Sequence, residues 1–167
     1  MPIQFISIPV MLILSVLQMT AISRITLLGG SADIILIAIA AWGIREKGSG
    51  VYVWALIGGL LISFASAVPF PAPLVPYLFT AFLARGIQSR LWQSPILSMI
   101  AVVAVGTIFQ HLFSILILQF KGLEIGLMEG LRSVTMPSLL LNFLFLFPVF
   151  SLINDLARWI LREEVYD

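Results

Sequence analysis

The chain has 167 residues, of which 60% are hydrophobic and 10% are charged, with a formal net charge of +1 and no cysteine. Soluble globular domains are typically about 45–50% apolar and about 25% charged, so this composition excludes a soluble domain and indicates a polytopic membrane protein. The near-neutral charge gives no reason to expect nucleic-acid binding, and the lack of cysteine excludes thiol catalysis, thiolate metal sites and disulfides.

Six apolar runs follow one another along the chain, separated by short polar breaks. Hydrocarbon offers the backbone no hydrogen-bond partner and the alternation of barrel strands is absent, so we expect helices and an all-α fold. The first run lacks a preceding basic segment, which favours a transmembrane helix over a cleaved signal peptide. No break is long enough for a soluble domain, so residues 1–167 are expected to form one transmembrane domain. The expected spans are Ile3–Ile22, Asp33–Ile44, Val51–Val68, Leu74–Ile87, Pro95–Leu118 and Val134–Ile153.

The second and fourth runs are shorter than the ~20 residues that cross a bilayer core of ~30 Å. Each follows a segment that disfavours helix, the glycines before Asp33 and the proline-rich residues 69–76. Non-helical backbone at membrane depth is tolerated only where protein or a cavity covers it, so we expect both segments to dip inward.

The distribution of lysine and arginine predicts the orientation, because cytoplasmic loops are enriched in both. With the N-terminus inside, the cytoplasmic segments hold Arg45, Lys47, Arg85, Arg90, Arg158 and Arg162. The outer segments hold Arg24, Lys121 and Arg132. This excess predicts that both ends of the chain are cytoplasmic. Aromatic residues near the expected span ends, where amphipathic rings prefer to lie, are Trp42, Tyr52, Trp54, Trp92 and Trp159.

Asp33 lies at the start of the second run, and two interpretations are open. Together with Ser31, it can offer side-chain oxygens to the first amides of the helix, where negative charge is favoured. Alternatively, Asp33 pairs with a buried cation or contacts a partner helix, because acids within membranes are commonly functional. Arg24 is the nearest such cation in the sequence.

The fifth run carries a polar face over two turns. Gly106, Gln110 and Ser114 recur four residues apart, with Thr107 and His111 alongside. Such a face points toward other helices or a small wet cavity rather than lipid. It is either an interhelical hydrogen-bond cluster, joined by Asn142 of the sixth run, or a ligand or proton site. A single histidine without cysteine cannot supply a metal site.

Two further features concern helix packing and the outer turn. A stripe of small residues on the third run, Ala55, Gly59, Ser63 and Ala67, allows close approach of a helix from this chain or another. Prolines fix the backbone between the third and fourth runs, either as a rigid connector or as a docking edge for an outer partner. These prolines are Pro69, Pro71, Pro73 and Pro76.

The end of the last run carries charges, and enzyme chemistry has little support anywhere. Asp155 and Arg158 stand three residues apart and can pair on one helix face. Arg158, Trp159 and Arg162 either anchor at the lipid interface or bind a cytoplasmic filament. No nucleophile elbow, zinc-binding helix motif or phosphate loop occurs, so we expect no catalytic activity and no cofactor.

Short motifs in the first four runs resemble MreD, the rod shape-determining membrane protein family of bacteria. Typical members carry L-Q-x-T-x-L, then a glycine followed closely by Pro-Asp-Leu, then D-x-x-S-G-x-P-x-G and a later tyrosine. The matching residues are Leu17, Gln18 and Thr20, then Gly30 and Asp33, then Ser66, Pro69 and Tyr77. The departures are Ala32 in place of proline, Ser63 in place of aspartate and Pro71 in place of glycine.

The resemblance implies a non-enzymatic scaffold of the cell-elongation machinery in the bacterial inner membrane, active in peptidoglycan synthesis and cell shape. Such a scaffold would bind MreC, a single-span protein with an outer coiled coil. Through MreC or directly, it would be linked to the MreB filament, to RodA and to the RodA transpeptidase. In this interpretation, the late start of the second helix at Asp33 leaves a notch for a partner.

The competing interpretation is a substrate-binding subunit of an energy-coupling-factor vitamin transporter, a class that MreD is thought to resemble in fold. Gln110, His111, Ser114 and Asn142 would then line a vitamin pocket. Such subunits commonly present small residues four apart on their first helix, whereas here Met11 stands between Ser7 and Ser15.

Overall fold

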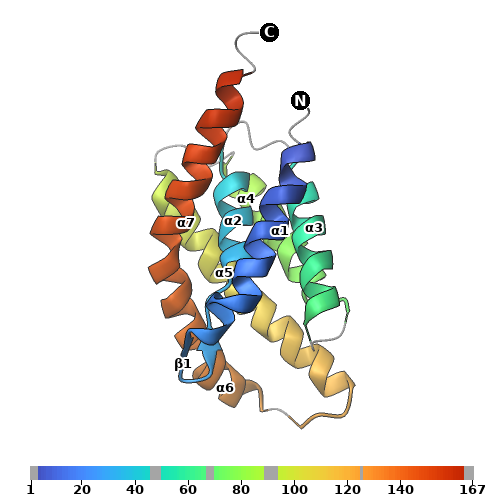
Figure 1. Ribbon diagram of the computed structural model, residues 1–167. Helices are drawn as coiled ribbons and strands as arrows, with labels where there is room; N and C mark the ends of the chain where they lie inside the picture. Colours follow the sequence, from blue (N-terminus) through green and yellow to red (C-terminus); the bar gives the residue numbers. More distant parts are fainter. Residues whose placement is uncertain (1–3, 46–49, 67–69, 89–93, 125, 164–167) are drawn as a thin grey trace.

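The computed structural model describes residues 4–45, 50–66, 70–88, 94–124 and 126–163. These residues form a helical bundle with one short hairpin (Figure 1), which confirms that the fold is all-α. The long helices are α1 (Gln4–Thr20), α2 (Ile34–Gly43), α3 (Val51–Ala65), α4 (Leu74–Gln88), α5 (Pro95–Phe120) and α7 (Met136–Glu163). The shorter elements are η1 (Ile22–Arg24), β1 (Thr26–Leu27), β2 (Gly30–Ser31), α6 (Leu127–Gly130) and the π-helical turn η2 (Leu131–Thr135).

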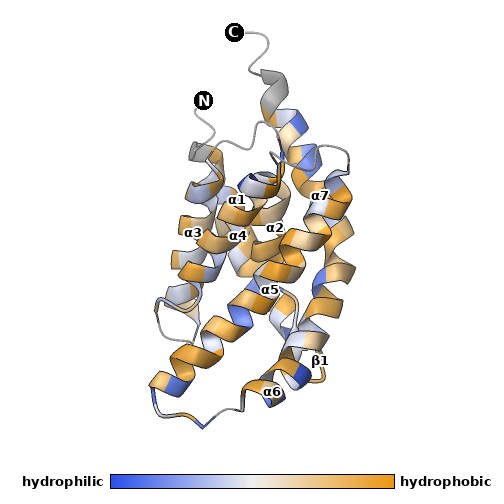
Figure 2. Cartoon of the chain, turned by 180° about the vertical axis from the view of Figure 1, so that it is seen from behind, coloured by the Kyte–Doolittle hydropathy of each residue, from blue (hydrophilic) through white to orange (hydrophobic). Residues whose placement is uncertain are grey.

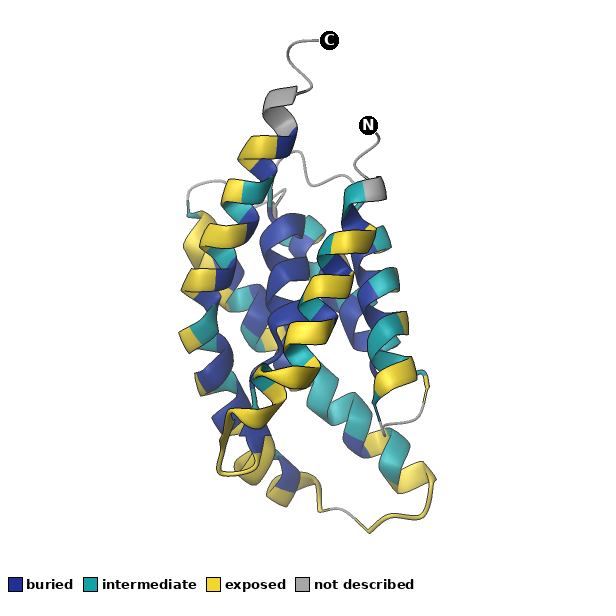
Figure 3. Ribbon diagram, in the orientation of Figure 1, coloured by how far each residue is buried: buried dark blue, intermediate teal, exposed yellow. Residues whose placement is uncertain are grey.

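Helix α2 is the core of the bundle. All ten of its residues are buried, and it contacts α1, α3, α4, α5 and α7 (Figure 3). An apolar helix without a polar face is stable only where other helices surround it, which is the case here. Its 10 residues span about 15 Å. The core helix is thus much shorter than a bilayer core is thick.

Many large apolar side chains are exposed on the outside of the bundle, and Figure 2 shows that hydrophobic residues predominate along its long helices. Among the described residues, three helical segments are long and apolar enough to cross a membrane: Ile6–Arg24, Pro95–Phe120 and Leu127–Ile160. These segments indicate that the protein associates with a membrane. The other three apolar helices, Ile34–Gly43, Val51–Ala65 and Leu74–Ile87, are shorter. Each of the six predicted runs contains a helix, but only three of these helices reach membrane-spanning length.

The last run differs most from its expected bounds. It was predicted to start near Val134 and to end near Ile153, but helical structure begins at Leu127 and α7 continues to Glu163. The extension at the C-terminal end agrees with the expected continuation of this helix beyond the apolar run. Figure 1 shows that α7 leads to the same end of the bundle as the N-terminus.

A tight hairpin connects α1 to α2 at the opposite end of the bundle. Strands β1 and β2 pair antiparallel, and Leu28 and Gly29 between them have positive φ angles of 49° and 93°. Positive φ at both central positions is the feature of a type I′ turn, which fits the twist of a hairpin. A Cβ on Gly30 would lie 2.6 Å from the backbone nitrogen of Ser138, so this glycine holds the hairpin against α7.

The aromatic side chains separate into two groups. Trp42 and Trp54 are each 1% exposed and stack with ring centroids 4.5 Å apart, so the prediction that they lie at the lipid interface is wrong. Their stacking joins the end of α2 to α3. Tyr52 and Trp159 are exposed, at 49% and 63%. Trp92 lies outside the described residues.

Candidate functional site

Asp33 caps α2, as its position in the sequence predicted. Its Oδ1 atom accepts hydrogen bonds from the amides of Ile35 at 3.1 Å and Leu36 at 2.9 Å. Ser31 does not share this role. It lies in β2, and its own amide donates to Ser138 Oγ of α7 at 3.1 Å. The side chain of Asp33 therefore begins the helix, while the preceding strand is fixed to α7.

The second carboxylate oxygen of Asp33 joins two more helices. Oδ2 accepts hydrogen bonds from Tyr77 Oη of α4 at 2.7 Å and from Gln110 Nε2 of α5 at 2.8 Å. The carboxylate thus receives four donors and also lies at the positive end of α2. Asp33 thereby connects the start of α2 to α4 and α5.

Asn142 of α7 completes the connection between the helices. Its Oδ1 atom accepts from the amide of Asp33 at 2.7 Å, and its Nδ2 atom donates to Thr107 Oγ1 of α5 at 2.8 Å. Thr107 in turn donates to the carbonyl of Val103 at 2.7 Å. Asn142 is 1% exposed, so its hydrogen bonds form in the interior, where unmade bonds are costly.

Gln18 of α1 holds the same turn from the other side. Its Nε2 atom donates to the carbonyl of Ala32 at 2.8 Å, and its Oε1 atom accepts from the amide of Ile34 at 2.9 Å. With the two bonds to Asp33, the first three amides of α2 all have an acceptor. A helix end buried in apolar surroundings requires such pairing.

A polar cavity of about 180 Å³ adjoins this network. Its lining includes Gln18, Ser31, Asp33, Ser66, Tyr77, Gln110, His111, Ser114 and Asn142. The volume is below the ~300–1,000 Å³ of typical small-molecule pockets. Gln110 Oε1 is buried without a hydrogen-bond partner among the described residues. The site thus has room for water molecules or a very small polar ligand.

His111 and Ser114 contribute differently to this region. His111 Nδ1 lies 3.0 Å from Thr135 Oγ1, which connects α5 to the π-helical turn. Ser114 lines the cavity one turn further along α5. Among the residues that the structure describes, no group of three or more His, Cys, Asp or Glu side chains is placed to hold a metal ion.

Four residues predicted as partner-binding or structural candidates lie away from the network. Arg24 is exposed at the end of η1, and the partners of Asp33 within the described chain are neutral groups rather than this cation. Ala55 is buried in α3, and a Cβ on Gly59 would lie 2.6 Å from Leu74 Cδ1. Ser63 Oγ donates to the carbonyl of Gly59 at 2.7 Å. At Gly59 the stripe therefore packs on α4 of this chain.

The remaining candidates are prolines between α3 and α4 and Ala67, which precedes this proline segment in the sequence. Pro71 is half-buried, and its carbonyl accepts from the amide of Val75 at 3.2 Å in the first turn of α4. Pro73 lines the polar cavity. Ala67 and Pro69 lie outside the described residues, as do Lys47 and Arg90 of the orientation argument.

The importance of Gln18 and Tyr77 was visible only through the MreD motifs. A glutamine within an apolar run and a tyrosine beside prolines are also common without any special role. What distinguishes them is their contact with residues 16 and 44 positions away, Ile34 and Asp33. Such contacts follow from tertiary packing and not from local pattern.

Comparisons with protein-family models, with curated proteins and with solved structures find no match to this chain. The expected resemblance to MreD therefore rests on the residues quoted in the sequence analysis alone. Several of them, from three separate segments of the chain, surround the start of α2.

Proposed function

We propose that the protein is a non-enzymatic membrane scaffold of the bacterial cell-elongation machinery, with MreC as its direct partner. In this role it crosses the inner membrane six times with both ends cytoplasmic. It supports peptidoglycan synthesis by holding MreC near MreB, RodA and the RodA transpeptidase. The lipid bilayer surrounds its apolar outer faces.

The observation that carries this proposal is the convergence of the family-like residues. Gln18, Asp33 and Tyr77 come from three different motifs, and all three bind the start of α2 or the residue before it. Ser66, from the third motif, lines the same cavity. Chance similarities have no reason to meet at one place, whereas residues that build a shared fold do.

The hydrogen bonding of Asp33 favours a structural role over catalysis. All four of its bonds hold backbone amides or side chains of this chain. A general acid or base must instead reach a substrate proton. The adjoining cavity, at about 180 Å³, is also small for a vitamin. Both features favour a scaffold over the transporter-subunit alternative.

The burial of Asp33 moves the expected partner surface away from this residue. Asp33 is 9% exposed and accepts hydrogen bonds from Tyr77 and Gln110, so side chains of this chain occupy part of the notch expected at this acid. The cavity that remains there has a volume of about 180 Å³, which is little room for a partner's helix. The hairpin and α6 form the accessible surface nearby. There, an open hollow of about 610 Å³ is lined by Leu28, Met128, Glu129, Arg132 and Ser133.

This outer hollow has the composition of a docking surface. Leu28 is 82% and Met128 63% exposed, and charged side chains of Glu129 and Arg132 border them. Exposed apolar side chains with a polar rim are typical of protein contacts. We assign the juxtamembrane segment of MreC to this hollow.

The test is co-purification of MreC with the tagged chain from native membranes in mild detergent. Leu28→Asp is the main variant, because aspartate tolerates the positive φ at this position. We expect it to lower MreC recovery about tenfold, the effect of removing one good apolar contact. Met128→Asp should act in the same direction.

Leu123→Asp is the matched control, because Leu123 is 52% exposed at the same end but is not part of the hollow. It should leave MreC recovery unchanged. Equal recovery from Leu28→Asp, Met128→Asp and the control would reject the hollow as the docking surface. Recovery of ATP-binding cassette subunits in place of MreC would reject the scaffold itself.

A further inference from the structure

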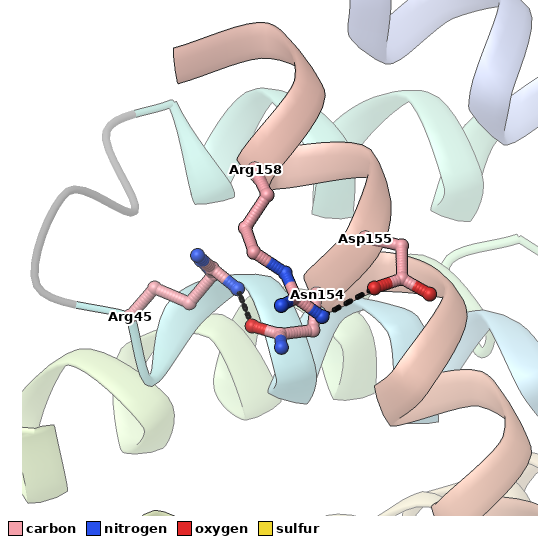
Figure 4. Close-up of polar contacts among 4 residues, drawn as sticks. All are labelled: Arg45, Asn154, Asp155 and Arg158. Carbon is pink, nitrogen blue, oxygen red and sulfur yellow. Dashed lines mark hydrogen bonds and ion pairs between the residues drawn. The ribbon is translucent and has the colours of Figure 1, made fainter. Parts of the chain in front are cut away.

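The C-terminal end of α2 is followed by a half-buried cation, Arg45, that has no carboxylate partner among the described residues. Arg45 follows α2, and its Nη1 atom donates to Asn154 Oδ1 of α7 (Figure 4). Arg85 of α4 donates from Nη1 to the carbonyl of Arg45 at 3.5 Å. Within the described chain, the guanidinium of Arg45 therefore has a neutral partner and no carboxylate.

A third arginine approaches the same place from α7. Arg158 lies one turn beyond Asn154, and Figure 4 shows that Arg45 and Arg158 both extend toward Asn154. Burial, and then the positive charge of Arg158, lower the pKa of Arg45. Proximity of the two guanidinium groups is thus unfavourable unless an anion lies near them.

Among the described residues, one carboxylate, that of Asp155, pairs with an arginine of this cluster. Asp155 Oδ1 accepts from Arg158 Nη2 at 2.5 Å, and the two side chains are 60% and 67% exposed. Within the described residues, Arg45, Arg85 and Arg158 carry three positive charges against this one carboxylate. Since solvent reaches the exposed pair, an incoming anion reaches the arginines from the same side.

The neighbouring surface favours a lipid as the source of that anion. Leu152 and Trp159, on the same helix as Arg158, are 68% and 63% exposed, so this part of α7 presents apolar side chains to its surroundings. Tryptophan prefers the boundary between headgroups and hydrocarbon, and Arg158 on the same helix turn lies at that depth. A phospholipid presents a phosphate and acyl chains together, whereas a soluble phosphate lacks the apolar part.

We propose that Arg45, Arg85 and Arg158 form a binding site for the phosphate headgroup of an anionic phospholipid. Guanidinium groups bind phosphate oxygens through paired N–H donors. The three arginines come from the ends of α2, α4 and α7, so one headgroup joins three helices at this end of the bundle. Zwitterionic lipids bind less well, because their ammonium group meets the excess positive charge.

The test measures lipid retention by native mass spectrometry of the intact protein with phosphatidylglycerol and phosphatidylcholine at equal concentration. Wild type is expected to retain phosphatidylglycerol preferentially. Arg158→Gln should lower that preference about fivefold, because each basic residue near a membrane surface contributes roughly this factor. Arg158 is exposed, so this variant is expected to fold. Arg45→Gln should lower the preference by a similar factor.

Arg24→Gln is the matched control, since Arg24 is exposed at the end of η1, beside the hairpin and away from the three arginines. It should retain the wild-type preference. Equal retention of both lipids by wild type, or a preference that survives both Arg158→Gln and Arg45→Gln, would overturn the proposal. Displacement of phosphatidylglycerol by millimolar inorganic phosphate would show that the site binds a soluble anion, and it would reject the proposal that the ligand is a phospholipid.

Discussion

An ionisable side chain lies at each end of α2, Asp33 at the start and Arg45 at the end, and the two differ in the partners that the chain provides. Asp33 at the start receives two backbone amides, a tyrosine hydroxyl and a glutamine amide. Arg45 at the other end has a neutral asparagine oxygen and a second arginine nearby. An acid at the N-terminus and a base at the C-terminus both suit the helix dipole. The dipole therefore explains their placement but not the difference in their partners.

The difference indicates two roles for a charge at a helix end. Where the chain supplies every partner, as at Asp33, the side chain organises the fold and removal of any partner costs stability. Where the described residues supply no carboxylate, as at Arg45, an anion from the surroundings can be the missing partner. Substitutions at the first end should thus change unfolding, and substitutions at the second should change ligand binding.

Asp33→Ala should have the largest effect on stability. It leaves the donors of Tyr77 and Gln110 and two helix amides unpaired in the interior. We expect a loss of about 3–5 kcal/mol in the free energy of unfolding, the range for breaking a buried polar network. Thermal unfolding in detergent, followed by circular dichroism, measures the loss.

Asp33→Asn is the control for this substitution, because it keeps the size of the side chain and one acceptor oxygen. It should cost clearly less than Asp33→Ala. If both variants unfold at the wild-type temperature, the network has no structural role and the comparison between the two helix ends fails.

Gly30→Ala should have the second largest effect, because it separates the Asp33 end from α7. The new Cβ would lie 2.6 Å from Ser138 N and 2.7 Å from the carbonyl oxygen of Val134. Backbone atoms cannot rotate away, so we expect a loss of about 2 kcal/mol from overpacking. Gly86→Ala, in α4 with open space around the new Cβ, should not destabilise. Equal unfolding temperatures for the two variants would contradict the close contact.

Tyr77→Phe should have a smaller effect, since Asp33 keeps three of its four donors. We expect about 1 kcal/mol, the net value of one hydrogen bond. Gln110→Leu removes the other donor to Oδ2. A double-mutant cycle should give a coupling energy of at least about 0.5 kcal/mol, as for other residues that share a partner. Strict additivity would mean that the two donors act independently.

The sequence predicts those features of the Asp33 end that depend on neighbouring residues. The helical runs follow from continuous apolar stretches, and the cap follows from an acid directly before one of them. The other partners could not be predicted locally. Asn142 lies 109 positions from Asp33, and only the packing of α7 against α2 brings them together.

Distant helices also determine how much space is left at Asp33. Tyr77 and Gln110 reach its carboxylate from α4 and α5, and a cavity of about 180 Å³ remains beside it. One expectation was wrong for a similar reason. Trp42 was expected at the lipid interface because it lies near the end of an apolar run, but Trp54 of α3 stacks on it and covers it. Arg45 and Asn154, again 109 positions apart, were not expected to meet. In each case, helices that are distant in the sequence determine the environment.

Asp155→Asn should have the smallest effect on stability and a clear effect on binding. The pair with Arg158 is exposed, so its loss should change the free energy of unfolding by less than about 0.5 kcal/mol. Removal of the carboxylate also frees Arg158 for an external anion, so phosphatidylglycerol retention should rise rather than fall. Asp155→Glu keeps the negative charge and should bind lipid as wild type does. A large loss of stability with unchanged lipid retention would place Arg158 among the structural charges, together with Asp33.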